Sequence, residues 1–258
     1  MKKALAIISF GTSYETGVKA IERIEQYMEK EFKEYDCFRA FTSNMILAKL
    51  KRQGVDIPTT KELLESLVEQ GYEEVICQPT HMIHGFEFDK MMDQIQTFKT
   101  KFKSLKVGNP MLHEEEDYRK CVTIYEKELP YKNKEEALVL MGHGSEHHAN
   151  SCYCQMEKMF QLAGREDIYI GTVEGFPMLS DVMEQLKGKK IKKVTLAPFM
   201  IVAGDHAAND MAGEEEDSWK CQFEKAGYEV DICMKGLGEY EGVAELYAEH
   251  IRKAEEIA

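Results

Sequence analysis

The sequence has no long hydrophobic run, and this absence argues against a membrane-spanning segment. None of its apolar stretches reaches the roughly 20 residues that a transmembrane helix needs. Near the start, a basic residue pair precedes a short apolar run at 4–10, but no small-residue cleavage pattern follows. We therefore expect a first strand there, no signal peptide, and a cytoplasmic protein without a membrane partner.

Closely paired cysteines of the C-x-x-C type are also missing, and the seven cysteines are odd in number. Scattered cysteines of this kind argue for reduced thiols, against a disulfide framework and against a thiolate zinc site. Cys152 and Cys154 are too close together for a typical zinc knuckle and are expected on a helix. The other five are Cys37, Cys77, Cys121, Cys221 and Cys233.

Positive charge is scarce: 33 Lys and Arg stand against 46 Asp and Glu, which gives a net charge of −13. Such a field repels nucleic acid, so we expect no nucleic-acid partner. The sequence has no G-x-S-x-G elbow for nucleophilic hydrolysis and no Walker lysine. The turn at 10–13 is too short for a dinucleotide fingerprint, so these three enzyme classes are not indicated.

The chain does have the composition of a globular protein, with 43% hydrophobic and 31% charged residues. Its 258 residues allow two domains of about 125 residues each. Short apolar runs alternate with segments of helical periodicity, which predicts an α/β fold. We expect an N-terminal half at 1–130 and a C-terminal half at 131–258, joined by the turn-rich stretch 130–134.

The individual elements follow from apolar runs, glycine stops and helical spacing. Thr60 is the candidate N-cap of the third helix. Strands are expected at 4–9, 36–42, 74–79, 105–108, 138–141, 168–173, 191–198 and 229–233. Helices are expected at 16–32, 44–53, 60–70, 88–102, 114–129, 149–162, 178–187, 219–226 and about 243–257.

The two halves resemble each other in sequence. Residues 4–13 align with 137–145 if one gap is allowed, and Phe10 then matches His143. Residues 74–87 align with 193–206, with proline and glycine positions in common, and Glu87 then matches His206. Two similar α/β halves facing each other would enclose a cleft lined by the strand ends of both.

Four polar residues follow predicted strands, where ligands bind in open parallel sheets. They are Glu87, His143, Glu174 and His206. His143 stands between two glycines that let backbone or substrate approach closely. Imidazoles and carboxylates without a thiolate suit an exchangeable divalent ion such as cobalt, nickel, iron or zinc. From the residues alone, hydrogen-bonded loop positions remain the alternative to a metal site.

Four further histidines flank these positions: His81, His84, His147 and His148. They are expected to be outer contacts, substrate-facing or exposed residues rather than ligands. His113 and His250 receive no role. Backbone donors at the helix starts after 11–13 and after 144–145 are candidates for binding anionic groups.

Several segments together resemble the anaerobic cobalt chelatase (CbiK) family. They are Phe10-Gly11-Thr12-Ser13-Tyr14, Phe38-Arg39-Ala40-Phe41-Thr42-Ser43, Met141-Gly142-His143-Gly144, Val202-Ala203-Gly204-Asp205-His206-Ala207 with Asn209-Asp210-Met211-Ala212, and Asp217-Ser218-Trp219-Lys220. The resemblance runs through nearly the whole chain. It implies a class II chelatase fold with two flavodoxin-like halves and parallel sheets, the active site in the cleft between them, and a closing helix at about 243–257 that can pack on the first half.

The resemblance also implies an activity and roles for residues. The activity is insertion of Co²⁺ into sirohydrochlorin, or precorrin-2, in anaerobic cobalamin biosynthesis, with no cofactor beyond the substrate metal. His143 matches the catalytic base and a metal ligand, His206 matches the second metal histidine, and Glu87 and Glu174 match acidic metal positions. Insertion expels two pyrrole protons, and a histidine of near-neutral pKa can accept them.

Two alternatives stay open. The ligand set does not discriminate cobalt from nickel or ferrous iron, so a chelatase for another metal fits equally. A non-catalytic carrier or sensor of tetrapyrrole or metal would need a cleft but no proton acceptor. The sequence does not settle which of Glu87 and Glu174 dominates coordination, and it leaves a homo-oligomer open.

Overall fold

The computed structural model describes residues 2–130 and 132–257, which form two compact units. Unit 1 combines the described residues up to His113 with those from Gly242 onwards, and unit 2 spans Glu114–Glu241. The expected halves met at 130/131 instead. The turn-rich stretch can be recognised in the sequence, but the packing of the helix before it cannot. Tyr125 of that helix lies edge-on against Phe160, with ring centroids 5.3 Å apart, so the helix belongs to unit 2. Tyr131, in the expected linker, lies outside the described residues.

Unit 1 contains a sheet with the order β2-β1-β3-β4-β9. The first four strands are parallel, and β9 joins the β4 edge antiparallel. The strands are β1 (Lys3–Ser9), β2 (Asp36–Phe41), β3 (Glu74–Pro79), β4 (Ser104–Val107) and β9 (Glu255–Glu256). The helices are α1 (Glu15–Glu31), α2 (Asn44–Arg52), α3 (Thr60–Glu69), α4 (Phe86–Gln96) and α9 (Val243–Arg252).

Unit 2 repeats this plan with the order β6-β5-β7-β8, all parallel. Its strands are β5 (Glu136–Gly142), β6 (Ile168–Thr172), β7 (Lys193–Pro198) and β8 (Glu229–Ile232). Its α-helices are α5 (Glu115–Glu128), α6 (Ser151–Leu162), α7 (Leu179–Leu186) and α8 (Trp219–Lys225). Short 3₁₀ turns lie at His148–Asn150 (η1) and Leu237–Glu239 (η3), and a π-helical turn, η2, spans Ala207–Met211.

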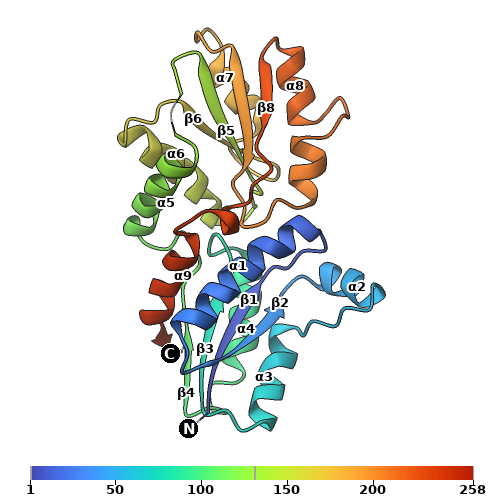
Figure 1. The fold of residues 1–258 in the computed structure, drawn as a ribbon, viewed down its shortest axis with the longest axis vertical. Coiled ribbons are helices and arrows are strands. Elements are labelled where there is room, and N and C mark those ends of the chain that lie inside the picture. Colours follow the sequence, from blue (N-terminus) through green and yellow to red (C-terminus); the bar gives the residue numbers. More distant parts are fainter. Residues whose placement is uncertain (1, 131, 258) are drawn as a thin grey trace. The chain divides into compact units, whose positions relative to one another are not determined.

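Helices cover both faces of each sheet, which explains why the central strands are apolar almost throughout. In unit 1, α3 and α4 pack on alternate residues of β1, and α1 and α9 pack together on the other face (Figure 1). In unit 2, α7 and α8 pack on alternate residues of β5, including Val139 and Met141. No helix of the described residues is long and apolar enough to cross a membrane.

The register supports the internal alignment. Ile8 of β1 pairs with Pro79 of β3, and Met141 of β5 pairs with Pro198 of β7. Phe10 and His143 each stand two residues beyond these partners, and Glu87 and His206 each stand eight residues beyond the matched prolines. The matched residues therefore occupy equivalent positions after equivalent strands. The two units share an α/β plan with parallel-dominated sheets, as expected.

Most observed boundaries lie within two residues of the expected ones, but two helix ends differ more, and one N-cap differs. Helix α4 ends at Gln96 instead of 102. Phe98 and Phe102 have the spacing of a helix face and do reach the core, but they reach it from turns after the helix. Helix α9 ends at Arg252 instead of 257, because β9 takes up the backbone groups that the edge of β4 offers. The N-cap of α3 is Thr59, not Thr60, since Thr59 Oγ1 accepts from the Glu62 amide.

Candidate active site

His143 follows directly on β5, and its two glycine neighbours are required by close packing. A Cβ on Gly142 would meet the Tyr153 ring at 2.3 Å. A Cβ on Gly144 would meet the Glu174 carbonyl oxygen at 1.9 Å, and Gly144 also has a positive φ of 83°. The Glu174 amide donates to the His143 carbonyl at 2.7 Å. The glycines thus fix the loop that carries His143 against its neighbours.

The imidazole of His143 is held through its Nδ1, which lies 3.0 Å from the Gly144 carbonyl oxygen. A carbonyl oxygen can only accept, so Nδ1 carries the hydrogen and Nε2 is the basic nitrogen. The ring is partly exposed. His143 can therefore accept a proton or bind a metal ion through Nε2.

His206 stands at the start of the π-helical turn η2, eight residues beyond the end of β7. Ala203, Ala207 and Met211 recur every four residues and are buried in the unit 2 core. This apolar stripe fixes the rotation of the turn and leaves His206 at its partly exposed side. His206 Nδ1 lies 2.5 Å from Oδ2 of Asp210.

The structure brings His143 and His206 together. Their ring centroids are 4.8 Å apart with the ring planes at 89°. Because β5 and β7 are adjacent parallel strands, their carboxyl ends deliver both loops to the same edge of the sheet. Two imidazoles, both partly open to solvent, can take a divalent ion and a proton in one place.

Glu174 does not join them in a complete ligand group. Its residue is exposed in the loop after β6, and its backbone rather than its carboxylate contacts the His143 loop. Within residues 2–130 and 132–257, no three His, Cys, Asp or Glu side chains are arranged to hold a metal ion. The histidine pair is thus the part of the expected site that the structure assembles.

Glu87 belongs to unit 1, where it lies in the first turn of α4 rather than at a strand end. Its Oε1 is 3.5 Å from Lys90 Nζ. Its Oε2 is buried and makes no hydrogen bond among the described residues. An unused carboxylate oxygen is therefore available for a ligand.

The flanking histidines contact protein groups, and the rings of His147 and His148 lie with centroids 4.0 Å apart. Burial lowers the pKa of His81 to about 4, and its Nε2 lies 3.4 Å from Thr42 Oγ1. His84 Nε2 lies 2.9 Å from His113 Nδ1. His147 accepts the Ala149 amide through Nδ1 at 3.1 Å and so caps η1. The hydrogen-bond distances give His81, His84 and His147 a structural partner.

The two helix starts that were expected to bind anions differ in whether their backbone donors are already used. The Ser145 amide donates to Asn150 Oδ1 at 2.9 Å, so it is already used within unit 2. Helix α1 begins after Tyr14, whose side chain makes no capping bond, and its first turn remains a candidate.

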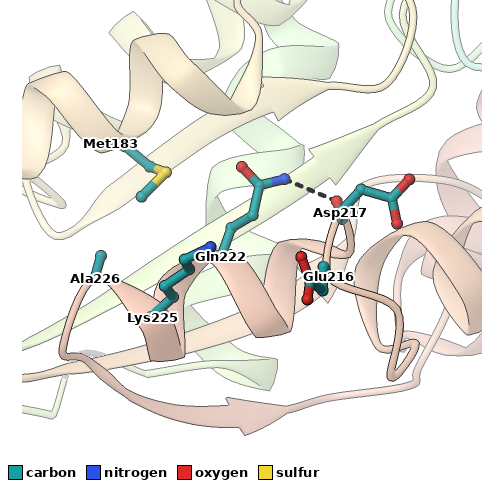
Figure 2. A pocket seen from close by; sticks show the side chains of 6 residues that line it. All are labelled: Met183, Glu216, Asp217, Gln222, Lys225 and Ala226. Carbon is teal, nitrogen blue, oxygen red and sulfur yellow. Dashed lines mark hydrogen bonds between the residues drawn. The ribbon is translucent and has the colours of Figure 1, made fainter.

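A surface pocket of unit 2 lies elsewhere. Figure 2 shows it between α7 and α8, together with the segment that leads into α8, and none of the four candidate residues lines it. Gln222 Nε2 donates to the Asp217 carbonyl at 2.7 Å. Its lining is Met183, Glu216, Asp217, Gln222, Lys225 and Ala226.

Sequence reasoning gave no role to Asp210 or Lys90, although both contact candidate residues. The available signal was spacing: Asp210 is four residues after His206, and Lys90 is three after Glu87, which puts each pair on one helical face. That signal depends on knowing that helical turns begin at 206 and 86.

Comparison with known proteins connects this geometry to a family. A family model described as cobalt chelatase (CbiK) matches residues 3–256. A sirohydrochlorin cobaltochelatase of Salmonella typhimurium is 38% identical over 256 residues, covering 98% of this chain and 97% of that protein. The sirohydrochlorin cobaltochelatase CbiKC of Nitratidesulfovibrio vulgaris is 28% identical over 258 residues, covering 98% and 90%.

A solved structure shares the fold. SirB from Bacillus subtilis with Fe³⁺ aligns over 98% of this chain and 95% of its own, with a TM-score of 0.67 and 14% identity.

Proposed function

The chain belongs to the cobalt chelatase (CbiK) family, and from that premise we propose that it is a sirohydrochlorin cobaltochelatase acting in anaerobic cobalamin biosynthesis. In this reaction Co²⁺ and sirohydrochlorin are the substrates. Two N–H bonds of the ring break, two protons leave, and four Co–N bonds form as the ion gives up its protein ligands, without any change in oxidation state. The protein must therefore hold the ion, release it and accept protons.

The observation that carries the proposal is the histidine pair in the segments that follow β5 and β7. His143 has its Nδ1 hydrogen committed to the Gly144 carbonyl, so Nε2 is free to take a pyrrole proton. His206 lies beside it, with ring centroids 4.8 Å apart, and we assign it the role of a metal ligand. A base next to a metal ligand is what coupled deprotonation and metal transfer require.

Glu87 and Glu174 complete the proposed metal set as oxygen ligands. Glu87 is the better supported of the two, since its Oε2 has no hydrogen-bond partner among the described residues. Imidazole and carboxylate ligands hold cobalt less firmly than a thiolate cage, so the ion can leave for the ring nitrogens. A cytoplasmic location and a homo-oligomeric state stay predictions.

The test is anaerobic absorbance spectroscopy of sirohydrochlorin with Co²⁺, Ni²⁺ and Fe²⁺ in parallel. We expect the protein to accelerate cobalt insertion above the rate in buffer. Acceleration with nickel or iron but not cobalt would replace the proposed metal. Tight binding of sirohydrochlorin with no acceleration for any ion would indicate a carrier and overturn the proposal.

A further inference from the structure

Asp210 is the group in closest polar contact with His206. Its Oδ2 lies 2.5 Å from His206 Nδ1, a charge-assisted hydrogen bond between residues four apart in the chain. The aspartate side chain is 47% exposed and that of His206 is 32% exposed, so neither is forced into contact by burial. The contact instead reflects how η2 directs both side chains.

The core holds η2 in the rotation that this contact needs. Ala207 and Met211 are fully buried, one residue after His206 and Asp210 respectively. The apolar pair and the polar pair are thus offset by one residue on neighbouring faces of the same turn. A π-helical turn is rare, and such turns occur frequently at functional sites.

The chemistry of the contact selects one tautomer of His206. A carboxylate only accepts hydrogen bonds, so Nδ1 must carry the hydrogen and Nε2 must carry the lone pair. Metal-bound histidines commonly donate their second ring nitrogen to a carboxylate, which fixes the ring and raises the basicity of the ligand nitrogen. His143 reaches the same tautomer through a neutral carbonyl, whereas His206 has a charged partner.

We propose that Asp210 is a positioning residue that holds His206 in the Nδ1–H tautomer, with Nε2 presented to the incoming divalent ion. This proposal rests on the proposed role of His206 as a metal ligand. Asp210 itself touches neither the metal nor the tetrapyrrole. Its effect is to strengthen ion capture, so it acts on the affinity for Co²⁺ more than on the proton-transfer step at His143.

The same segment offers a matched control. Asp205 Oδ1 accepts a hydrogen bond from Asn209 Nδ2 at 3.1 Å, also four residues apart. This pair stands one residue before the His206–Asp210 pair and involves no imidazole. Asp205→Ala removes a carboxylate of the same kind from the same segment, but it leaves the His206 contact in place.

The first readout is the tautomer in the metal-free protein. Two-bond ¹H–¹⁵N spectra of ¹⁵N-histidine-labelled protein are recorded at about pH 8, where an imidazole of ordinary pKa near 6.5 is neutral. The His206 signal, assigned with His206→Gln, should show Nδ1–H in the wild type and in Asp205→Ala. In Asp210→Ala it should shift toward Nε2–H, the form that free imidazole prefers. An unchanged His206 pattern in Asp210→Ala overturns the proposal.

The second readout is Co²⁺ itself, measured by calorimetry and by the KM for Co²⁺ in the insertion assay. Loss of an outer carboxylate typically weakens metal binding by about 10–100-fold, and we expect this for Asp210→Ala with kcat at saturating Co²⁺ changed much less. Asp210→Asn keeps an accepting oxygen without the charge and should fall between Asp210→Ala and the wild type. A shifted tautomer with unchanged Co²⁺ binding overturns the assigned effect on ion capture.

Failure of the proposed function gives a different pattern. If the wild type does not accelerate insertion of any ion, the chelatase assignment fails, yet the tautomer spectra and Co²⁺ calorimetry still decide the role of Asp210. Circular dichroism and thermal melting of each variant check that η2 and the unit 2 core remain folded.

Discussion

In unit 1, Ile8 of β1 pairs with Pro79 of β3. Phe10 stands two residues beyond Ile8, and Glu87 stands eight residues beyond Pro79. In unit 2 the same two positions are His143 and His206, whose rings lie 4.8 Å apart. The strand order around these positions is the same in both units. One sheet plan therefore supports proton-accepting nitrogens in one unit and an aromatic ring with a carboxylate in the other.

This difference shows that the position of a loop on the sheet and the chemical groups it carries are determined by different residues. The loops leave the strands at equivalent points because apolar runs and prolines fix the register. The chemistry then depends on single residues placed at those points. The tests below compare the matched positions, beginning with the largest expected effect.

The sharpest comparison is His143→Ala against Phe10→Ala. Removing the proposed general base should lower the insertion rate by at least about 100-fold, equal to about 2.7 kcal/mol in the barrier. Phe10 has no group that can accept a proton, so Phe10→Ala should cost much less. Steady-state absorbance assays, with circular dichroism as the folding check, measure both. Equal losses in the two variants would mean that His143 contributes no base.

A second comparison concerns His81, whose matched residue in unit 2 is Met200, two places beyond Pro198. Burial lowers the pKa of His81 to about 4, below its unfolded value of about 6.5, so the unfolded state binds more protons between these values. The contribution of His81 to the free energy of unfolding is fully present above about pH 6.5 and is lost as the pH falls toward 4. At pH 5 this loss is about 2 kcal/mol.

The variant His81→Met gives unit 1 the residue of unit 2 and should remove this acid-dependent loss. Urea unfolding at neutral pH and at about pH 5 measures the effect as a difference, which cancels any packing change common to both conditions. An equally steep acid loss in wild type and His81→Met would show that other groups cause it.

The third comparison is between two of the proposed metal ligands, Glu87 and His206. Glu87→Gln keeps the shape of the side chain and removes its charge, and we expect roughly tenfold weaker Co²⁺ binding, or about 1.4 kcal/mol. Lys90→Met removes the ammonium group 3.5 Å from the Glu87 carboxylate and should not weaken binding. Calorimetric titration with Co²⁺ compares them. Unchanged affinity in Glu87→Gln would leave the metal with the histidines alone.

The smallest effect concerns two helix starts that the structure shows to be equivalent. Thr59 bridges to Phe41 and Met178 bridges to Thr172, each at the residue after a proline. Thr59 Oγ1 caps α3, whereas the Met178 side chain gives α7 no capping bond. Thr59→Ala should therefore cost about 1 kcal/mol of stability.

Met178→Thr should supply the missing cap and stabilise by up to about 1 kcal/mol, since Asp181 Oδ2 already accepts from the Met178 amide at 2.7 Å. Urea unfolding measures both substitutions. A loss in both would show that the two helix starts are not interchangeable.

The sequence was sufficient for much of the fold because local apolar patterning determines the strands. The strand 74–79 was predicted with its observed ends, since the helix before it stops at Gly71 and a proline closes the strand. The 3.6-residue pattern could not tell that Phe98 and Phe102 reach the core from turns, nor that Glu255–Glu256 pair with β4. Both depend on long-range packing that no local pattern records.

The candidate site was predictable in part for the same reason. His143 and His206 follow adjacent strands, and the internal repeat pointed to both. The π-helical turn and its Asp210 contact were not foreseeable, because an i,i+4 pair is informative only once the segment is known to be helical.

The return of residues from Gly242 onwards to unit 1 has a consequence for synthesis on the ribosome. Helix α9 packs on α1 and β3, and its Val243, Tyr247 and Ile251 are buried. Domains generally fold as units while the chain emerges. Unit 2 is complete once Glu241 has left the exit tunnel, whereas unit 1 still lacks this helix and the β9 edge. The unit that is translated first is therefore finished last, and its nascent form carries an uncovered apolar face until α9 arrives.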